Sequence, residues 1–91
     1  MQYKNEKTLH LIKKLGNLLK EKRLQNNALS LNTFAYGYDL NPGNISRIEN
    51  GQIEPKFTMM WRIAEALNLP LSCIIRELEE ELGENFYINE K

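Results

Sequence analysis

Residues 41–51, which read Asn-Pro-Gly-Asn-Ile-Ser-Arg-Ile-Glu-Asn-Gly, carry the clearest helix signals in this chain. The side chain of Asn41 is suited to cap a helix N-terminus, and Pro42 fits the first turn, where its missing N–H costs nothing. Gly51 is suited to the left-handed conformation that follows many helices. The stretch therefore predicts a short, sharply bounded helix over residues 42–50.

Helical periodicity also marks four other segments, which short clusters of Asn, Gly and Pro separate. No segment alternates between apolar and polar residues as a half-buried strand does. The sequence therefore predicts a compact all-α domain of five helices. The other four helices are expected at about 8–26, after Ser30 to about 38, after Pro55 to 67 and from about 70 or 71 to 82.

Individual residues within these segments lead to further expectations. Thr8 and Ser30 are suited to cap the first two helices. Gly37 is expected inside the second helix, where it costs about 1 kcal/mol relative to alanine. Phe57 and Trp61 are expected in the core, because aromatic side chains dominate burial in a small domain.

The composition excludes several classes of protein. A chain of 91 residues suits one domain, and no apolar run approaches the ~20 residues that span a membrane. The single cysteine, Cys73, allows no internal disulfide and reads as a small buried apolar residue. His10 is the one histidine and has no partner for a metal site or a catalytic unit. We expect a cytoplasmic protein that is not an enzyme, with no cofactor, metal, membrane contact or small-molecule ligand.

The net charge is zero, but the charges are divided unevenly along the chain. Residues 1–47 hold eight Lys and Arg against three acids, a balance of +5, and residues 48–91 hold four against nine, a balance of −5. Such a division can present a basic face to a polyanion. The alternative is a chance clustering of solvated surface charges.

The string Asn-Ile-Ser-Arg-Ile-Glu-Asn-Gly at 44–51 resembles the recognition-helix signature of lambda-repressor-like domains, the Cro and Xre type of regulator. The resemblance extends over roughly residues 12–75. It implies a helix-turn-helix, formed by the second and third helices, that binds duplex DNA. The other matching residues are Leu15-Gly16, Leu19 and Arg23, then Leu29-Ser30 and Phe34-Ala35, and downstream Pro55 and Ile63-Ala64-Glu65-Ala66-Leu67-Asn68-Leu69.

The resemblance places the DNA contacts at the start of the third helix and along one of its faces. Arg47 is expected to bind guanine O6 and N7, and Asn44 is expected to pair with adenine N6 and N7. Gly43 has no side-chain donor or acceptor, and it is expected to allow close approach of the backbone. The expected DNA-binding residues of this region are Asn41, Gly43, Asn44, Ser46, Arg47 and, after the loop, Lys56.

The chain departs from the family's pattern around the second helix. Leu31 stands where the family commonly has a glutamine that holds a phosphate, so Asn32 or the backbone amides at Leu31 are expected to replace it. Asp39 stands where the turn often has glycine, and aspartate tolerates left-handed geometry. Since Pro42 and Gly43 cannot read a base edge, we expect a dimer or indirect readout to supply further specificity.

The resemblance also implies that Glu49 pairs with Arg23 inside the domain, because an unpaired buried carboxylate would be costly. The fifth helix and the tail carry more apolar residues than a four-helix core needs. We therefore expect a two-fold homodimer through both, since half-sites one DNA turn apart require two-fold symmetry. The expected interface residues are Ile74, Ile75, Leu78, Leu82 and Phe86. The alternative is that this helix folds back on Leu9 and Ile12 of the first helix.

The function expected from these features is that of a small bacterial or phage-type transcriptional repressor, which occupies an operator as a homodimer. The helix-turn-helix domain is expected to span residues 1–83, followed by a short acidic tail over 84–91. The alternative is a protein-interaction or antitoxin-like accessory module with weak DNA readout. The acidic second half of the chain would suit a basic protein partner.

Overall fold

The computed structural model describes residues 5–26, 31–38 and 40–89, with the backbone alone for residues 31 and 32. This part of the chain forms five helices and no strand, which confirms the predicted all-α fold. The expectations for Ser30 and Asp39 lie outside the described residues. The helices are α1 (Glu6–Gln25), α2 (Leu31–Tyr36), α3 (Pro42–Glu49), α4 (Phe57–Leu67) and α5 (Leu71–Leu82).

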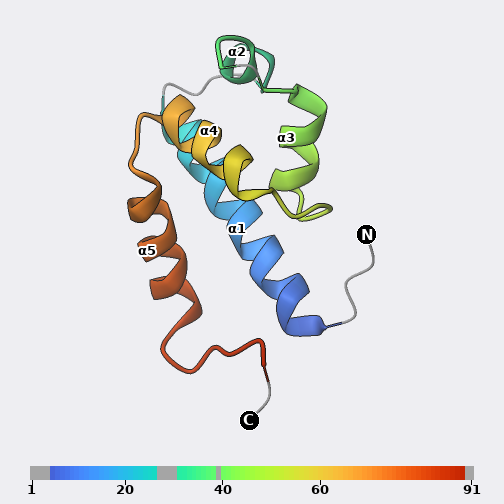
Figure 1. Cartoon of the computed structure of the whole chain (residues 1–91), viewed down its shortest axis with the longest axis vertical. Helices are drawn as coiled ribbons and strands as arrows, with labels where there is room; N and C mark the ends of the chain where they lie inside the picture. Colours follow the sequence, from blue (N-terminus) through green and yellow to red (C-terminus); the bar gives the residue numbers. More distant parts are fainter. Residues whose placement is uncertain (1–4, 27–30, 39, 90–91) are drawn as a thin grey trace.

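The long α1 is the support on which the other helices assemble. Figure 1 shows α3 and α5 lying on different sides of α1, and both contact it. The short α2 contacts α3 at one end of the molecule, and α4 contacts α5. None of the helices in the described ranges is long and apolar enough to cross a lipid bilayer.

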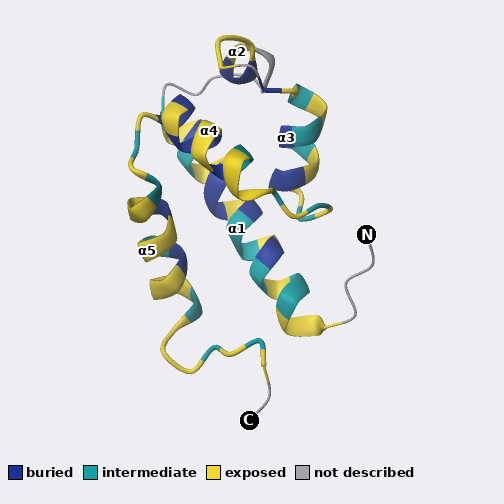
Figure 2. Ribbon diagram, viewed as in Figure 1, coloured by how far each residue is buried: buried dark blue, intermediate teal, exposed yellow. Residues whose placement is uncertain are grey.

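All five helices contribute to one hydrophobic core. In Figure 2 the buried side of each helix faces the interior of the fold, whereas much of α2 and the outer face of α5 are exposed. Burial of apolar surface is the main stabilising term for such a domain. The buried core residues are Leu18, Leu19, Phe34, Ala35, Leu40, Ile45, Ile48, Met60, Ile63, Ala64, Ala66, Leu67, Ile74 and Leu78.

Two predicted helix boundaries are wrong. Asn5 caps α1, because its Oδ1 accepts hydrogen bonds from the backbone N–H groups of Lys7, at 2.8 Å, and Thr8, at 3.4 Å. Thr8 therefore lies inside α1 and is not its N-cap. Gly37 lies beyond the end of α2 at Tyr36, so it carries no helix penalty.

The boundaries of α3 and α4 follow their capping residues. The Oδ1 of Asn41 accepts a hydrogen bond of 3.1 Å from the backbone N–H of Asn44, as expected for an N-cap. Gly51 has a φ of +71°, which confirms the predicted left-handed conformation after α3. Asn68 ends α4 with a φ of 58°, in the same region of backbone space.

Three residues expected to be buried are exposed. Phe57 and Trp61 are 68% and 54% exposed, because the core is filled from the other face of α4 by Met60 and Ile63. Cys73 is also exposed, since the next residue in α5, Ile74, takes the inward position. These three expectations were wrong because an apolar residue type does not determine which face of a helix meets the core.

Candidate nucleic-acid interface

The C-terminal end of α3 is docked on α1 through a glycine. A Cβ atom added at Gly16 would lie 2.2 Å from the carbonyl oxygen of Ile48 and 2.9 Å from that of Glu49. No side chain fits in that space, so glycine allows the backbones of the two helices to approach closely. A Cβ at Gly51 would likewise lie 2.6 Å from Cγ of Lys13, one turn before Gly16 on α1.

An ion pair fixes the same end of α3. The Nε of Arg23 donates to Oε2 of Glu49 at 2.8 Å, and Nη2 donates to Oε1 at 3.0 Å. The two residues are 6% and 5% exposed, so the expected structural ion pair is present and buried. Because Arg23 lies two turns after Gly16 on one face of α1, the glycine contact and the ion pair act together to orient α3.

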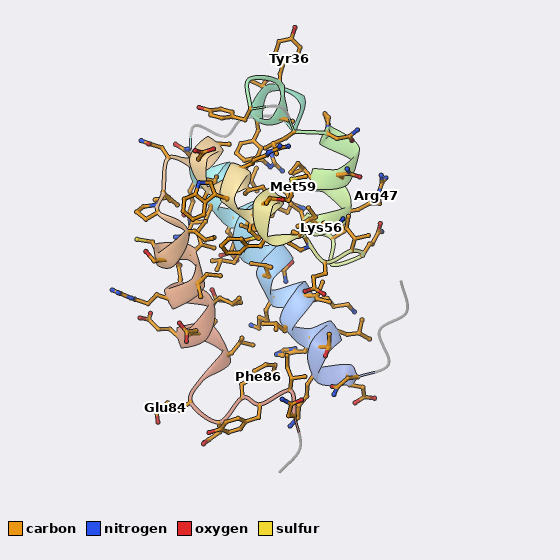
Figure 3. The ribbon with its side chains drawn as sticks, viewed as in Figure 1. Tyr36, Arg47, Lys56, Met59, Glu84 and Phe86 are labelled. Carbon is orange, nitrogen blue, oxygen red and sulfur yellow. The ribbon has the colours of Figure 1, made fainter. Side chains whose placement is uncertain are left out.

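The opposite end and the outer face of α3 remain open to solvent. Asn41, Gly43 and Arg47 are exposed, and Asn44 and Ser46 are partly exposed. Figure 3 shows Arg47 on the side of α3 that faces away from α1 and α4. The structure therefore brings these five predicted site residues together on one accessible surface of a single helix.

Two side-chain hydrogen bonds organise this surface. The Nη2 of Arg47 donates to Oδ1 of Asn44 at 2.9 Å, which joins the two expected base-reading residues. The Nδ2 of Asn50 donates to the hydroxyl oxygen of Ser46 at 3.5 Å. In their unbound state, Arg47 and Asn44 are thus partners of each other.

A groove separates α3 from the beginning of α4. Its volume is about 270 Å³, and its walls include Asn44 and Ile48 on one side and Lys56, Thr58 and Arg62 on the other. Lys56 is the N-cap residue of α4, and because an ammonium group cannot accept a hydrogen bond, its side chain does not cap the helix. Helix N-termini favour anions, and Lys56 adds a positive charge at the same place, although Glu54 contributes a negative charge to the same groove.

The other two predicted site residues give less information. Leu31 and Asn32 begin α2, but their side chains are not described. Tyr36, which the sequence reasoning did not single out, is 92% exposed at the end of α2 and projects away from the fold (Figure 3). Tyr36 is exposed because the adjacent Phe34 and Ala35 occupy the inward side of α2.

Several basic residues of the first half of the chain pair with acidic residues of the second half inside the domain. Lys22 pairs with Glu77 at 2.6 Å, and Lys14 lies 4.0 Å from Glu81, so two basic residues of α1 face acids of α5. Arg23 is buried with Glu49 as described above. Three basic residues of the first half of the chain, Lys14, Lys22 and Arg23, therefore face acids within the domain, whereas Arg47 lies on the exposed face of α3.

The residues expected to form a dimer interface fall into two groups. Ile74 and Leu78 are 0% and 6% exposed on the side of α5 that packs into the domain, so assigning them to an interface is wrong. This agrees with the alternative in which the fifth helix folds back on α1. Leu82 and Phe86 are partly exposed, and Ile75 is 38% exposed.

The tail after α5 turns back toward the beginning of α1. The ring of Phe86 lies 6.1 Å from that of His10, and Nδ2 of Asn5 donates to the backbone oxygen of Ile88 at 3.3 Å. Figure 3 shows Phe86 between the tail and the lower part of α1. Phe86 thus has a partner within its own chain.

An exposed apolar surface lies instead across α4 and α5. The rings of Phe57 and Trp61 are 6.2 Å apart, and Trp61 and Ile75 both line a groove of about 650 Å³ between the two helices. We call Phe57, Trp61 and Ile75 the α4–α5 strip. Contiguous exposed apolar residues of this kind commonly mark an interaction surface.

Comparison with known proteins agrees with this fold. The family model described as helix-turn-helix, of the Cro/C1 type, matches residues 19–72, more than half of the chain. No curated protein sequence matches the chain.

Several solved structures are similar in fold. The clp gene regulator ClgR from Corynebacterium glutamicum is 21% identical, with a TM-score of 0.71 over 82% of this chain and 96% of that chain. A variant of the restriction-modification controller protein C.Esp1396I is 22% identical, with a TM-score of 0.74 over 80% and 96% of the two chains. The controller protein C.AhdI from Aeromonas hydrophila is 28% identical, with a TM-score of 0.63 over 77% and 97%.

Proposed function

Since the chain belongs to the Cro/C1-type helix-turn-helix family of DNA-binding transcriptional regulators, we propose that it is a sequence-specific repressor that occupies its operator as a two-fold homodimer. Membership of this family makes the chain a regulator and not an enzyme. Its site of action would be the bacterial cytoplasm.

The observation that carries the proposal is the way α3 is held. Its C-terminal end is fixed to α1 by the close approach at Gly16 and the buried pair of Arg23 and Glu49. Its N-terminal end, with Asn41 and Gly43, is exposed, and so is Arg47 on its outer face. A helix of this kind can enter the major groove of DNA, which is about 12 Å wide, while the rest of the domain stays outside.

Phosphate contacts would position α3 in the groove. The first turn of α4 and Lys56 lie across a protein groove from α3. When α3 lies in the major groove of DNA, a backbone phosphate beside the bases that α3 reads can contact Lys56 and this turn. Such contacts fix register and add affinity, but they carry no sequence information. Lys56 would therefore contribute equally on all DNA sequences.

The α4–α5 strip supports a second copy of the chain as partner. A two-fold interface uses the same patch on both protomers, and apolar aromatic residues at its centre supply most of the binding energy. Sequence-specific binding also requires two copies, because a single α3 has few side chains that can hydrogen-bond to base edges. The proposed interface therefore moves from the stripe expected at Ile74 and Leu78 to Phe57, Trp61 and Ile75.

Repression by occupancy needs a DNA-reading surface and a dimer contact, and the described residues offer a candidate for each. A reporter promoter that overlaps the bound DNA site tests this part of the proposal. Expression should fall when the protein is supplied. A rise in expression would identify an activator instead.

DNA binding is tested by fluorescence anisotropy with a pool of random-sequence duplexes of about 30 base pairs, titrated with salt. Affinity should fall steeply, with log K declining by about 0.9 per log unit of salt for each phosphate contacted. Absence of binding at low salt would contradict the proposal. It would favour a protein-interaction module on the same fold, for which the α4–α5 strip would then be the surface to examine.

The dimer is tested by light scattering at micromolar concentration. The wild-type chain should have twice the monomer mass, and Trp61→Ser should reduce that mass toward the monomer value. Tyr36→Ser is the matched control, because Tyr36 is a more exposed aromatic residue outside the α4–α5 strip. A monomeric wild type, or equal effects of the two variants, would contradict the proposed interface.

A further inference from the structure

Asn44 and Arg47 are one turn apart on α3 and are joined by a hydrogen bond. The Nη2 group of Arg47 donates to Oδ1 of Asn44 at 2.9 Å, and both residues are accessible to solvent. Positions three apart share one face of a helix, so the two side chains point to the same place. The bond has a charged donor, which makes it stronger than a bond between neutral groups.

The guanidinium group of Arg47 lies close to Gly43, at the N-terminal end of α3. A Cβ atom at Gly43 would lie 3.6 Å from Nη1 and 3.8 Å from Nη2 of Arg47, which is ordinary van der Waals contact, and 3.1 Å from Oδ1 of Asn41. Long side chains on a helix lean toward its N-terminus, and this direction brings the charge of Arg47 to the end of α3 that would enter the groove.

The donors of Arg47 suffice for both a base and Asn44. A guanidinium group has five N–H donors, and Asn44 takes one of them. A pair of donors remains for O6 and N7 of guanine. Asn44, in contrast, would need its Oδ1 to accept from N6 of adenine while Nδ2 donates to N7. The bond from Arg47 already takes one of the two lone pairs of that oxygen and directs the amide toward Arg47.

Resting on the proposed DNA-binding function, we propose that Asn44 is a positioning residue, which holds the guanidinium group of Arg47 on guanine and does not itself read adenine. The recognition surface of α3 then reads one guanine in each half-site through the pair of Asn44 and Arg47. Specificity at neighbouring positions comes from the shape of the DNA and from the second protomer.

The test uses a duplex selected from a random library by the wild-type protein, together with its single-base variants. Dissociation constants at one fixed salt concentration are measured for wild type, Asn44→Ala, Asn44→Asp and Arg47→Ala. Wild type should prefer guanine at the contacted position by roughly 5–150-fold, which corresponds to the usual 1–3 kcal/mol per bidentate pair. Arg47→Ala should abolish this preference.

The two asparagine variants decide the role of Asn44. Asn44→Ala should reduce the guanine preference to less than about threefold and leave the preferences at neighbouring bases unchanged. Asn44→Asp should restore the guanine preference, because a carboxylate holds the guanidinium group more strongly, while its negative charge weakens binding to every duplex. If both variants keep the guanine preference and lose an adenine preference at a neighbouring base, Asn44 is a direct reader and the inference is overturned.

Two controls separate this result from other failures. Asn50→Ala removes an equivalent amide from the other end of α3, where its partner is Ser46, and should leave the guanine preference unchanged. The cap on α3 uses the backbone N–H of Asn44, which both substitutions retain, so circular dichroism should show unchanged helix content. If the wild type selects no motif at all, the proposed function fails; if Arg47→Ala alone loses the guanine preference, this inference fails and the function stands.

Discussion

Loss of one partner from the buried ion pair between Arg23 and Glu49 should strongly destabilise the domain. Both side chains are almost fully buried and share two hydrogen bonds, so Glu49→Leu leaves the guanidinium group of Arg23 in the core without its carboxylate partner. Breaking such a pair costs about 3–5 kcal/mol. A domain of 91 residues has a free energy of unfolding of roughly 5–14 kcal/mol, so this loss removes a large part of it.

The assay is urea unfolding followed by far-ultraviolet circular dichroism at one fixed chain concentration, because dimerisation makes apparent stability depend on concentration. Glu49→Leu and Arg23→Met should each lower the free energy of unfolding by about 3–5 kcal/mol, which lowers Tm by roughly 12–40 °C. The double variant should recover to within about 1.5 kcal/mol of wild type, since an apolar pair can replace a buried ion pair. The double-mutant cycle then gives a large coupling energy.

The pair of Lys14 and Glu81 provides the control. These side chains are 38% and 37% exposed and 4.0 Å apart, so Glu81→Gln should change the free energy of unfolding by less than about 1 kcal/mol. The reasoning would be refuted if Glu49→Leu cost as little as Glu81→Gln. It would also be refuted if the double variant were as unstable as the sum of the two single variants.

Three further substitutions test other parts of the account. Gly16→Ala should lower the free energy of unfolding by more than about 2 kcal/mol because its Cβ would meet the backbone oxygen of Ile48, whereas Gly37→Ala, in open space, should change it by less than about 0.5 kcal/mol. Equal effects of the two variants in urea unfolding would contradict the close approach of α1 and α3. Asn68→Val should cost about 1–2 kcal/mol because of the left-handed backbone, and Asn68→Gly should be tolerated; the two variants would be equally stable if that conformation were absent. Lys56→Ala should weaken binding to all duplexes alike and reduce the salt slope by about 1; a changed base preference in library selection would instead make Lys56 a base reader.

Local signals in the sequence were sufficient to predict α3. Asn41, Pro42 and Gly51 act through their own backbone geometry and nearest neighbours, so each took the expected capping or terminal role. The pairing of Arg23 with Glu49 joins residues far apart in sequence, and it came from the family resemblance and not from periodicity. The ends of α3 could therefore be predicted from local sequence, but its packing against α1 could not.

Features that depend on neighbouring helices were not predictable in the same way. Trp61 and Ile74 are both apolar residues in apolar segments, but the packing of α4 and α5 exposes the first and buries the second. The need for glycine at position 16 appears when the backbone of α3 is placed against α1, and nothing in the local sequence of α1 requires it. The same limit explains why the first proposal for the dimer surface named the core side of α5.

Selection from a random duplex library, carried out in parallel with wild type and Arg47→Ala at near-physiological salt, tests the central claim most directly. That claim is that α3, held on α1, reads duplex DNA through Arg47 as part of a two-fold dimer. Wild type should enrich an inverted repeat with half-sites about 10 base pairs apart and a guanine in each, and Arg47→Ala should lose the guanine. Failure of the wild type to enrich any motif, or enrichment of the same motif by Arg47→Ala, would contradict the account.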